Sequence, residues 1–192
     1  PRLFPPASVR HRTTFPGQFW FGSGEFFAPN PPSAAVLSFY LPRELPNGVD
    51  VAIQDSAGQT VRALKAPAHA GLNRVCWDLR WAPAMSEGFP APAAPCMEPR
   101  GPEGPFAAAG RYTVTISGSG LPTMTAELSV GPDPRSKITP AERKAHDESV
   151  MSAYRLQRQL IAPRRVGQEL NAQLANVRVA AGTGDASERA EQ

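Results

Sequence analysis

Apolar and polar residues alternate along several short segments of this chain, and a period of two is typical of β-strands. In segment 73–80, for example, Val75, Trp77 and Leu79 share one face of the expected strand. Segments of this character are 35–41, 49–55, 60–64, 73–80, 111–116 and 123–130. No helical pattern separates them, so parallel pairing through crossover helices is excluded. The sequence therefore predicts a mainly β fold, an immunoglobulin- or fibronectin-like antiparallel β-sandwich over residues 35–132.

The pattern changes after residue 133. Thr139, Pro140 and Glu142 form a helix-start signature: a capping side chain, proline at the first helical position, and an acid in the first turn. Apolar residues then recur at helical spacing on both sides of Pro163. We expect an α-helical hairpin over residues 139–181, broken at that proline, and a disordered tail over 182–192.

Proline and glycine are frequent in two segments that show neither a helical nor a strand periodicity. Residues 1–34 form an arm rich in proline and aromatic residues, and residues 82–109 hold seven prolines. We expect the arm to pack on its own or a neighbouring domain, and the long insertion at 82–109 to be mobile. A seventh strand could lie near 29–34 or within the insertion.

Composition and charge exclude some functions. The net charge is only +3 and is spread along the chain, so there is no basic stripe for nucleic acid. No apolar run is long enough for a membrane span. The chain starts at Pro1 without an initiator Met or a signal-peptide core, which we expect of a fragment or a processed product. Whether Cys76 and Cys96 pair is left open.

Motifs for catalysis, cofactor binding or metal binding are absent from the sequence. The three histidines have no ligand spacing, and there is no nucleophile elbow, phosphate loop or dinucleotide fingerprint. No two acidic residues stand out in the sequence as the carboxylate pair that glycoside hydrolysis needs. Asp78 is the most interesting of them, but we expect it, with Arg80, to fix a turn or pair across the sheet. We expect Asp55 to form a turn.

Aromatic residues are the remaining candidates. Phe19, Trp20, Phe21 and Trp81 could form an interface or stack on a sugar. Trp77 has the position of a core residue in a sandwich.

Several of these motifs together resemble a known family. Segment 71–80, with 55–62 before it and 110–114 after it, resembles a bacterial FlgD-type immunoglobulin-like domain. In this resemblance Trp77, Asp78, Arg80 and Tyr112 form the structural core motif. The Asn-Pro-Pro run at 30–32 and the Asp-Pro-Arg run at 133–135 extend the resemblance to roughly residues 20–180. This longer pattern is similar to the C-terminal region of secreted bacterial proteins whose front halves are sortilin-like BNR-repeat β-propellers, often labelled glycosyl hydrolases.

The resemblance implies an extracellular or periplasmic location and a propeller, in the same protein or in a partner subunit, as the docking partner. The Asp-box of BNR repeats is missing from this sequence, so no catalytic residue carries over. We therefore expect a non-catalytic accessory module that acts by packing and uses no cofactor. The alternatives are a carbohydrate-binding module that takes a glycan, and a hydrolase in its own right.

Overall fold

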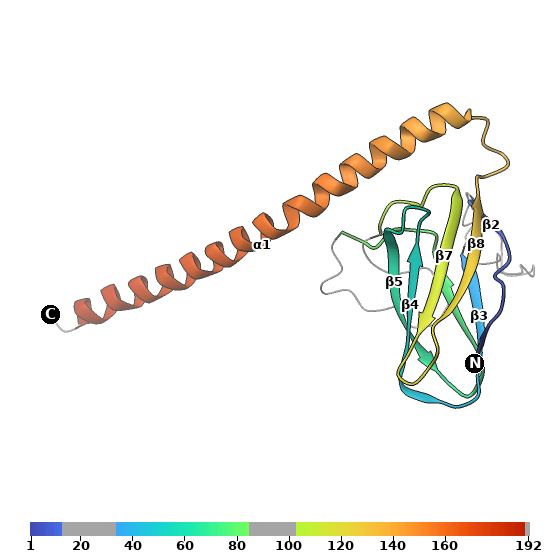
Figure 1. Cartoon of the computed structure of the whole chain (residues 1–192). Helices are drawn as coiled ribbons and strands as arrows, with labels where there is room; N and C mark the ends of the chain where they lie inside the picture. Colours follow the sequence, from blue (N-terminus) through green and yellow to red (C-terminus); the bar gives the residue numbers. More distant parts are fainter. Residues whose placement is uncertain (13–33, 85–102, 191–192) are drawn as a thin grey trace, which may run out of the picture.

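The structure, a computed structural model, describes residues 1–12, 34–84 and 103–190. It is mainly β, with two sheets and one C-terminal helix (Figure 1). The elements are β1 (Arg2–Leu3), β2 (Val9–Arg10), β3 (Ala35–Leu41), β4 (Leu45–Gln54), β5 (Thr60–Ala68), β6 (Gly71–Trp77), β7 (Gly110–Ser117), β8 (Met124–Gly131) and α1 (Pro140–Ala190). Each of the six segments predicted as strands contains a strand, β3 to β8, but β6 ends at Trp77, so residues 78–80 of the predicted strand 73–80 form a turn instead.

The two sheets enclose one hydrophobic core. One sheet has the strand order β1-β3-β6 and the other β2-β8-β7-β4-β5. Strand alternation supplies the core, because every second side chain of β3 and β7 points inward and is buried. The largest fully buried side chains come from both sheets and include Leu37, Phe39, Ile53, Trp77, Ile116 and Leu128.

The N-terminal residues are not the irregular arm that the sequence predicted. β1 pairs antiparallel with β3, and β2 pairs parallel with β8, so the first ten residues add an edge strand to each sheet. Two-residue strands are too short to leave a period in the sequence. Their position is fixed by backbone hydrogen bonds, such as those from Phe4 N to Ser38 O and from His11 N to Gly131 O, each 3.0 Å. Residues 13–33 lie outside the described part of the chain.

Two turns of the larger sheet depend on particular residues. Asp55 forms the turn between β4 and β5, as predicted, since its Oδ1 accepts hydrogen bonds of 2.9 Å from the amides of Ala57 and Gln59. Gly48 lies in β4 with a φ of 68°, where the register with β5 shifts. A Cβ at this position would overlap the carbonyl oxygen of Ala66, so both the φ and the space require glycine.

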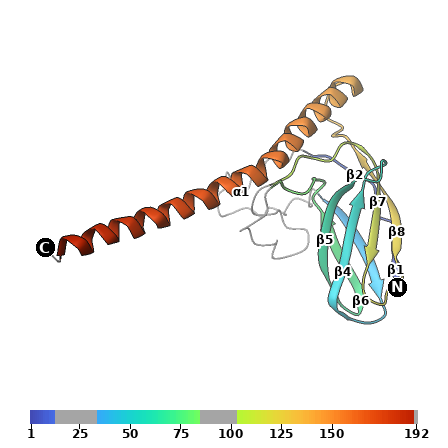
Figure 2. The same cartoon turned by 60° about the vertical axis from the view of Figure 1, so that its left-hand side comes forward.

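The C-terminal region corrects the predicted hairpin. α1 is a single helix of 51 residues that continues through Pro163, and the described residues 182–190 of the predicted tail are helical too. A proline removes one intrahelical hydrogen bond and tends to bend a helix, but most of the residues that follow it here, Gly167 excepted, have good helix propensity. Figure 2 shows the helix changing direction part-way along its length and leading away from the sheets.

The start of the helix agrees with the sequence. Thr139 Oγ1 accepts a hydrogen bond from the amide of Glu142, and the Glu142 carboxylate accepts one of 2.8 Å from the Thr139 amide. This reciprocal pair is a capping box. Hydrogen bonding to the Thr139 amide lowers the pKa of Glu142.

The described ends of the 82–109 insertion are packed against the sandwich. Ala107 is fully buried, and its amide donates to Leu79 O at 2.8 Å. Gly104 lies so close to Trp81 that a Cβ would overlap the Trp81 carbonyl. The expectation of mobility is therefore wrong for residues 103–109, while residues 85–102 lie outside the described part. Cys76 is disulfide-bonded, and Cys96, the other cysteine of the sequence, lies in that outside segment.

Candidate functional site between the sandwich and helix α1

A tight turn follows β6 and positions the side chains of Asp78, Arg80 and Trp81. Leu79 is buried and has a φ of 59°, an uncommon conformation for a residue with a Cβ. Asp78 Oδ1 accepts a hydrogen bond of 3.1 Å from the Arg80 amide, and Trp77 Nε1 donates to the Arg80 carbonyl at 2.9 Å. These two contacts hold the chain in the turn and so direct the Arg80 and Trp81 side chains.

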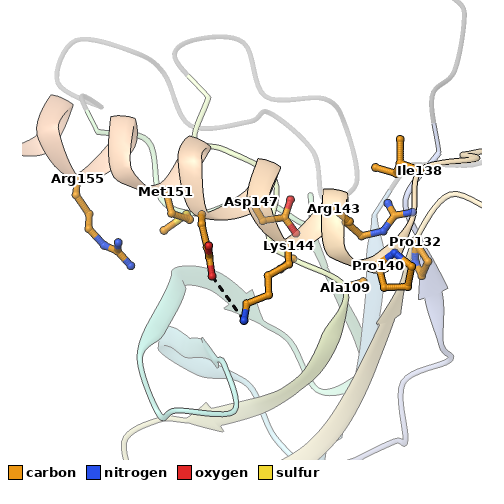
Figure 3. Close-up of a pocket in the computed structure, with 11 residues that line it drawn as sticks. Ala109, Pro132, Ile138, Pro140, Arg143, Lys144, Asp147, Met151 and Arg155 are labelled. Atoms are coloured by element: carbon orange, nitrogen blue, oxygen red, sulfur yellow. Dashed lines mark ion pairs between the residues drawn. The ribbon is translucent and has the colours of Figure 1, made fainter.

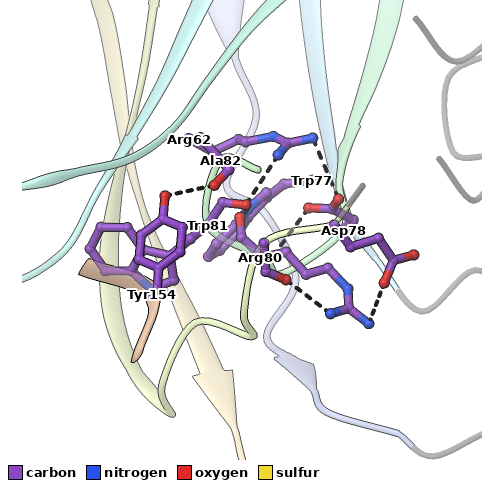
Figure 4. A network of polar contacts seen from close by, with 9 residues as sticks. Arg62, Trp77, Asp78, Arg80, Trp81, Ala82 and Tyr154 are labelled. Carbon is purple, nitrogen blue, oxygen red and sulfur yellow. Dashed lines mark hydrogen bonds and ion pairs between the residues drawn. The ribbon is translucent and has the colours of Figure 1, made fainter. Parts of the chain in front are cut away.

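Charged groups surround this turn (Figure 4). The Arg62 guanidinium lies 3.5 Å from Asp78 and donates to the Trp81 carbonyl at 3.1 Å. The Arg80 guanidinium lies 2.9 Å from Glu103 and donates to the Gly104 carbonyl. Both acids therefore have a cation as a structural partner, and the arginines tie β5 and the 103–109 segment to the turn.

Arg80 also stacks on an aromatic ring. Its guanidinium carbon lies 3.7 Å from the centroid of the Phe106 ring, within the range of a cation–π contact. Phe106 in turn meets His11 edge to face, with 5.3 Å between the ring centroids. The row Arg80–Phe106–His11 runs from the turn towards the start of α1.

Helix α1 contacts the sandwich at Trp81. Tyr154 is buried, its ring centroid lies 6.1 Å from that of Trp81, and its hydroxyl donates to the Ala82 carbonyl at 2.6 Å. Trp81 is itself only 8% exposed, so it is not the sugar-stacking platform considered from the sequence. Its ring is covered by a residue 73 positions later in the sequence, which no local pattern could indicate. Phe19, Trp20 and Phe21 lie outside the described residues.

Tyr112 stands in the core beside Trp77. The two ring centroids are 5.1 Å apart in an edge arrangement, and the Tyr112 hydroxyl donates to the Ala108 carbonyl at 2.5 Å. Burial raises the pKa of Tyr112 to about 12, so the phenol stays protonated and keeps this hydrogen bond. The structure thus brings Trp77, Asp78, Arg80 and Tyr112 to one end of the sandwich.

A groove of about 610 Å³ runs between the first turns of α1 and the sandwich (Figure 3). It is lined by apolar side chains, among them Ala109, Ile138 and Met151, and by Lys144 and Glu148, whose charged atoms are 3.8 Å apart. A second hollow beside it includes His11 and Asp133. Cationic and acidic side chains both line this groove.

His11 lines the second hollow, beside the start of α1. Burial lowers its pKa, and its Nε2 lies 2.8 Å from the Ala107 carbonyl. A carbonyl accepts, so the ring donates from Nε2. Asp147 opposes the shift, whereas Arg143 and Arg80 add to it. At neutral pH the ring is therefore an uncharged donor that ties the N-terminal strand region to the 103–109 segment.

Beyond its contact with Trp81, α1 exposes large apolar side chains. The exposed fractions of five of them lie between 54% and 64%: Leu156, Leu160, Leu170, Leu174 and Val177. Two further exposed apolar residues, Tyr40 and Leu72, face each other across β3 and β6 on the outside of the smaller sheet. Apolar surface of this kind marks an interaction site more often than a catalytic one.

Among the described residues, no group of three or more His, Cys, Asp or Glu side chains could hold a metal ion. Within the same ranges, no helix combines the length and the apolar composition that crossing a bilayer needs. Comparison with protein-family models, with curated proteins and with solved structures finds no match for this chain. The candidate site is therefore defined by its geometry: a rigid turn, a docked helix base and an exposed apolar helix.

Sequence reasoning missed Tyr154 as an anchor, and it missed Phe106 and His11. In the sequence, Tyr154 is one of the residues that recur at helical spacing before Pro163. Its burial depends on Trp81, from a segment that has no helical or strand pattern. The one signal that could have found it is that tyrosine is amphipathic and tends to lie where an apolar face meets a polar acceptor.

Proposed function

We propose that this chain is a non-catalytic interaction module of a larger exported protein, which acts by docking through helix α1. The observation that carries the proposal is the row of half-exposed leucines on a helix whose base is anchored to the sandwich. A helix stabilised only by its own backbone gains little in water, and most helices depend on packing of an apolar face. Leu170 and Leu174 lie far beyond the Tyr154 anchor, so their face needs a partner.

We also propose that the β-sandwich is of the immunoglobulin type. In the order β1-β3-β6 against β2-β8-β7-β4-β5 the chain changes sheet after β3, after β5 and after β6, while β4-β5 and β7-β8 are antiparallel neighbours in one sheet, as in immunoglobulin- and fibronectin-like sandwiches. The hydrogen bond from Tyr112, near the start of β7, back to the Ala108 carbonyl is like the tyrosine corner of those folds. The buried Trp77 lies on β6, which differs from the tryptophan position of antibody domains. These features support a FlgD-like, immunoglobulin-type module.

Export is supported by two observations. Cys76 is disulfide-bonded, and disulfides persist in oxidising compartments such as the periplasm or the cell exterior. The motifs at 71–80 and 133–135 resemble the C-terminal region of secreted sortilin-like β-propeller proteins. On this basis the docking partner is a propeller of the same protein or a partner subunit.

The absence of catalysis is proposed from the roles of the acids. Asp55 holds a turn, Asp78 binds Arg62 and the Arg80 amide, and Glu103 pairs with Arg80. An acid whose oxygens are engaged in this way is poorly placed to exchange protons with a substrate. The carbohydrate-binding alternative loses one of its four aromatic candidates, because Trp81 is buried.

Hydrogen exchange tests the docking proposal directly. Amide exchange over residues 156–177 is compared between this chain at high dilution and the full-length gene product. We expect slower exchange in the longer protein, because docking adds packing that opposes local unfolding. Equal exchange in the two samples would mean that the helix face stays uncovered, and the docking proposal would be wrong.

An activity assay tests the non-catalytic part. The purified chain is incubated with panels of glycosides and peptides, and we expect no turnover above buffer. Turnover that is lost in an Asp78→Asn variant, while the fold is retained, would refute this part of the proposal. Asp55→Asn serves as the matched control, since it removes a turn carboxylate remote from the Arg80 network.

A further inference from the structure

The exposed residues of α1 form a seam with coiled-coil spacing. Positions 156, 160, 163, 167, 170, 174 and 177 follow one another at alternating steps of four and three residues. This is the spacing of the core positions in a heptad repeat. The residues are leucine or valine except at the centre of the seam, where Pro163 and Gly167 stand.

The seam lies on the side of the helix away from the sandwich. With 3.6 residues per turn, Leu156 and Leu160 lie roughly 200° and 240° around the axis from Tyr154. Tyr154 is the buried residue that contacts Trp81. The face that α1 uses to hold the sandwich and the face that forms the seam are therefore separate, and both can be occupied together.

The shape of the seam fits another helix. From position 156 to 177 it runs about 32 Å at 1.5 Å per residue, as a narrow row of side chains. A row with a period of 3.5 residues stays in contact with a second helix that winds around it, whereas a sheet or a compact pocket would meet only part of it. The partner expected from this geometry is a helix with a matching seam.

We infer that the partner is a second copy of this chain, bound antiparallel through α1 with its centre near residue 165. In that alignment Leu160 lies opposite Leu170 of the second copy, and Leu156 opposite Leu174. Pro163 lies opposite Gly167, so the bulky ring meets the position without a side chain. This inference rests on the proposed function and, of the two partners proposed there, assigns this face of the helix to a partner subunit, namely a second copy of this chain, and not to a propeller.

The centre of the seam decides between the two orientations. In a parallel pair each position meets its own equivalent, so Gly167 faces Gly167 and leaves a void in the seam. Pro163 would also face Pro163 one step earlier, with two rings at one level. Cavities and overpacking both weaken association, and only the antiparallel pair combines the large residue with the small one. The result is an isologous contact with two-fold symmetry.

The flanks of the seam also suit self-association, with one exception near its centre. Gln157, Gln159, Asn171 and Gln173 border it with amides, which both donate and accept hydrogen bonds. Arg164 is the one charged residue of the sequence at a flanking position between 157 and 173. Residue 164 lies one position from the centre of the antiparallel pair, so the Arg164 side chains of the two copies flank the two-fold axis, with Asn171 of the second copy further along the same side. This is a like-charge contact that the pair has to accommodate. The antiparallel pair also places the two sandwiches at opposite ends, because each lies at the start of its helix (Figure 2).

Sedimentation of the whole chain over a range of concentrations tests the association. We expect a concentration-dependent dimer of twice the chain mass of 20.5 kDa. Leu170→Glu should raise the dimer dissociation constant roughly 100-fold, since two leucines leave the seam and two charges enter it. Ala172→Glu adds the same charge on the opposite side of the same turn and should change it less than about threefold. Leu72→Glu, on the outer face of β6, should behave like Ala172→Glu.

Cysteine cross-linking tests the orientation. Chains with Leu156→Cys and chains with Leu174→Cys are mixed, oxidised and analysed by non-reducing electrophoresis, with the parent chain as the control for the native cysteines. We expect a cross-linked dimer from the mixture and none from Leu156→Cys alone, because two copies of residue 156 would be about 27 Å apart. A dimer from Leu156→Cys alone would show a parallel pair and overturn the antiparallel assignment.

The outcomes separate this inference from the proposed function. A chain that stays monomeric up to high concentration, or a dimer that Leu170→Glu leaves intact, overturns self-association through the seam. If residues 156–177 are then still protected from exchange in the full-length protein, docking survives and the partner is a different surface. If they are unprotected there as well, both proposals fail.

Discussion

Tyr154 is the residue by which helix α1 is anchored to the sandwich, and its removal should detach the base of the helix. Two losses are expected in Tyr154→Ala. The hydrogen bond from the hydroxyl to the Ala82 carbonyl contributes about 1 kcal/mol to the free energy of unfolding. The aromatic ring, only 6% exposed against Trp81, contributes about 2 kcal/mol through burial. The expected total is about 3 kcal/mol.

Two further variants show how much of this free energy comes from the hydroxyl and how much from burial of the ring. Tyr154→Phe keeps the ring and removes the hydroxyl, so we expect a loss of about 1 kcal/mol. Tyr40→Ala makes the same truncation at a tyrosine that is 46% exposed on the outer face of β3, and we expect about 1 kcal/mol from lost strand packing. The free energies are measured by urea denaturation at one low protein concentration, because self-association would otherwise add to stability.

Tryptophan emission gives an independent readout. Detaching Tyr154 exposes the Trp81 ring to water, so the emission of Tyr154→Ala should shift to the red, and that shift should be absent in a Trp81→Phe background. The reasoning is refuted if Tyr154→Ala is no more destabilising than Tyr40→Ala and leaves the emission unchanged. In that case the helix base would not be held by this contact.

Three further substitutions test the sandwich and its charges. Gly48→Ala should lower the free energy of unfolding by at least about 3 kcal/mol, because the added Cβ both clashes and requires an unfavourable φ. Gly58→Ala is the control, with a φ of 78° but open space around it, and should cost roughly 1 kcal/mol. Equal losses in denaturation would contradict the packing at Gly48. Folding lowers the pKa of His11, so the unfolded chain binds a proton more readily than the folded chain. The stability that the neutral ring contributes is therefore lost as the pH falls from the unfolded pKa of about 6.5 towards the folded one. The melting temperature of His11→Gln should therefore fall less between pH 7 and pH 5 than that of the parent chain, and parallel pH profiles would refute this assignment. Arg80→Lys should lower the free energy of unfolding by about 1–2 kcal/mol, because an ammonium cannot both pair with Glu103 and stack on the Phe106 ring as a guanidinium does. A loss equal to that of an exposed Arg→Lys change elsewhere would contradict the role of Arg80 in these two contacts.

Much of the sandwich could be predicted from the sequence because its signals are local. The alternation in 35–41 and 111–116 gave both the strands and their buried faces, and the turn at Asp55 follows from a carboxylate that bonds amides two and four residues later. The helix start at Thr139 is equally local. Each of these features involves residues within a few positions of one another, where residue type and spacing decide the geometry.

The candidate site was predicted less well. Trp81 was a candidate for an interface or for a sugar-stacking platform, but Tyr154 covers it from 73 positions away. The hairpin break was placed at Pro163, where propensity alone favours a stop, yet the helix continues. A local rule gives the penalty of one missing hydrogen bond, and it cannot weigh that penalty against the helical residues that follow.

The sequence by itself determined which residues point into the core, where the turns lie and where the helix begins, because these depend on side chains and backbone groups that are neighbours in the chain. Only the tertiary structure decided that β1 and β2 complete the two sheets, and that the ends of the insertion pack on the turn after β6. It also decided that one face of α1 is held by the sandwich while the opposite face is left exposed. These outcomes depend on contacts between distant segments, whose free energy is known only when the surfaces they bury are known.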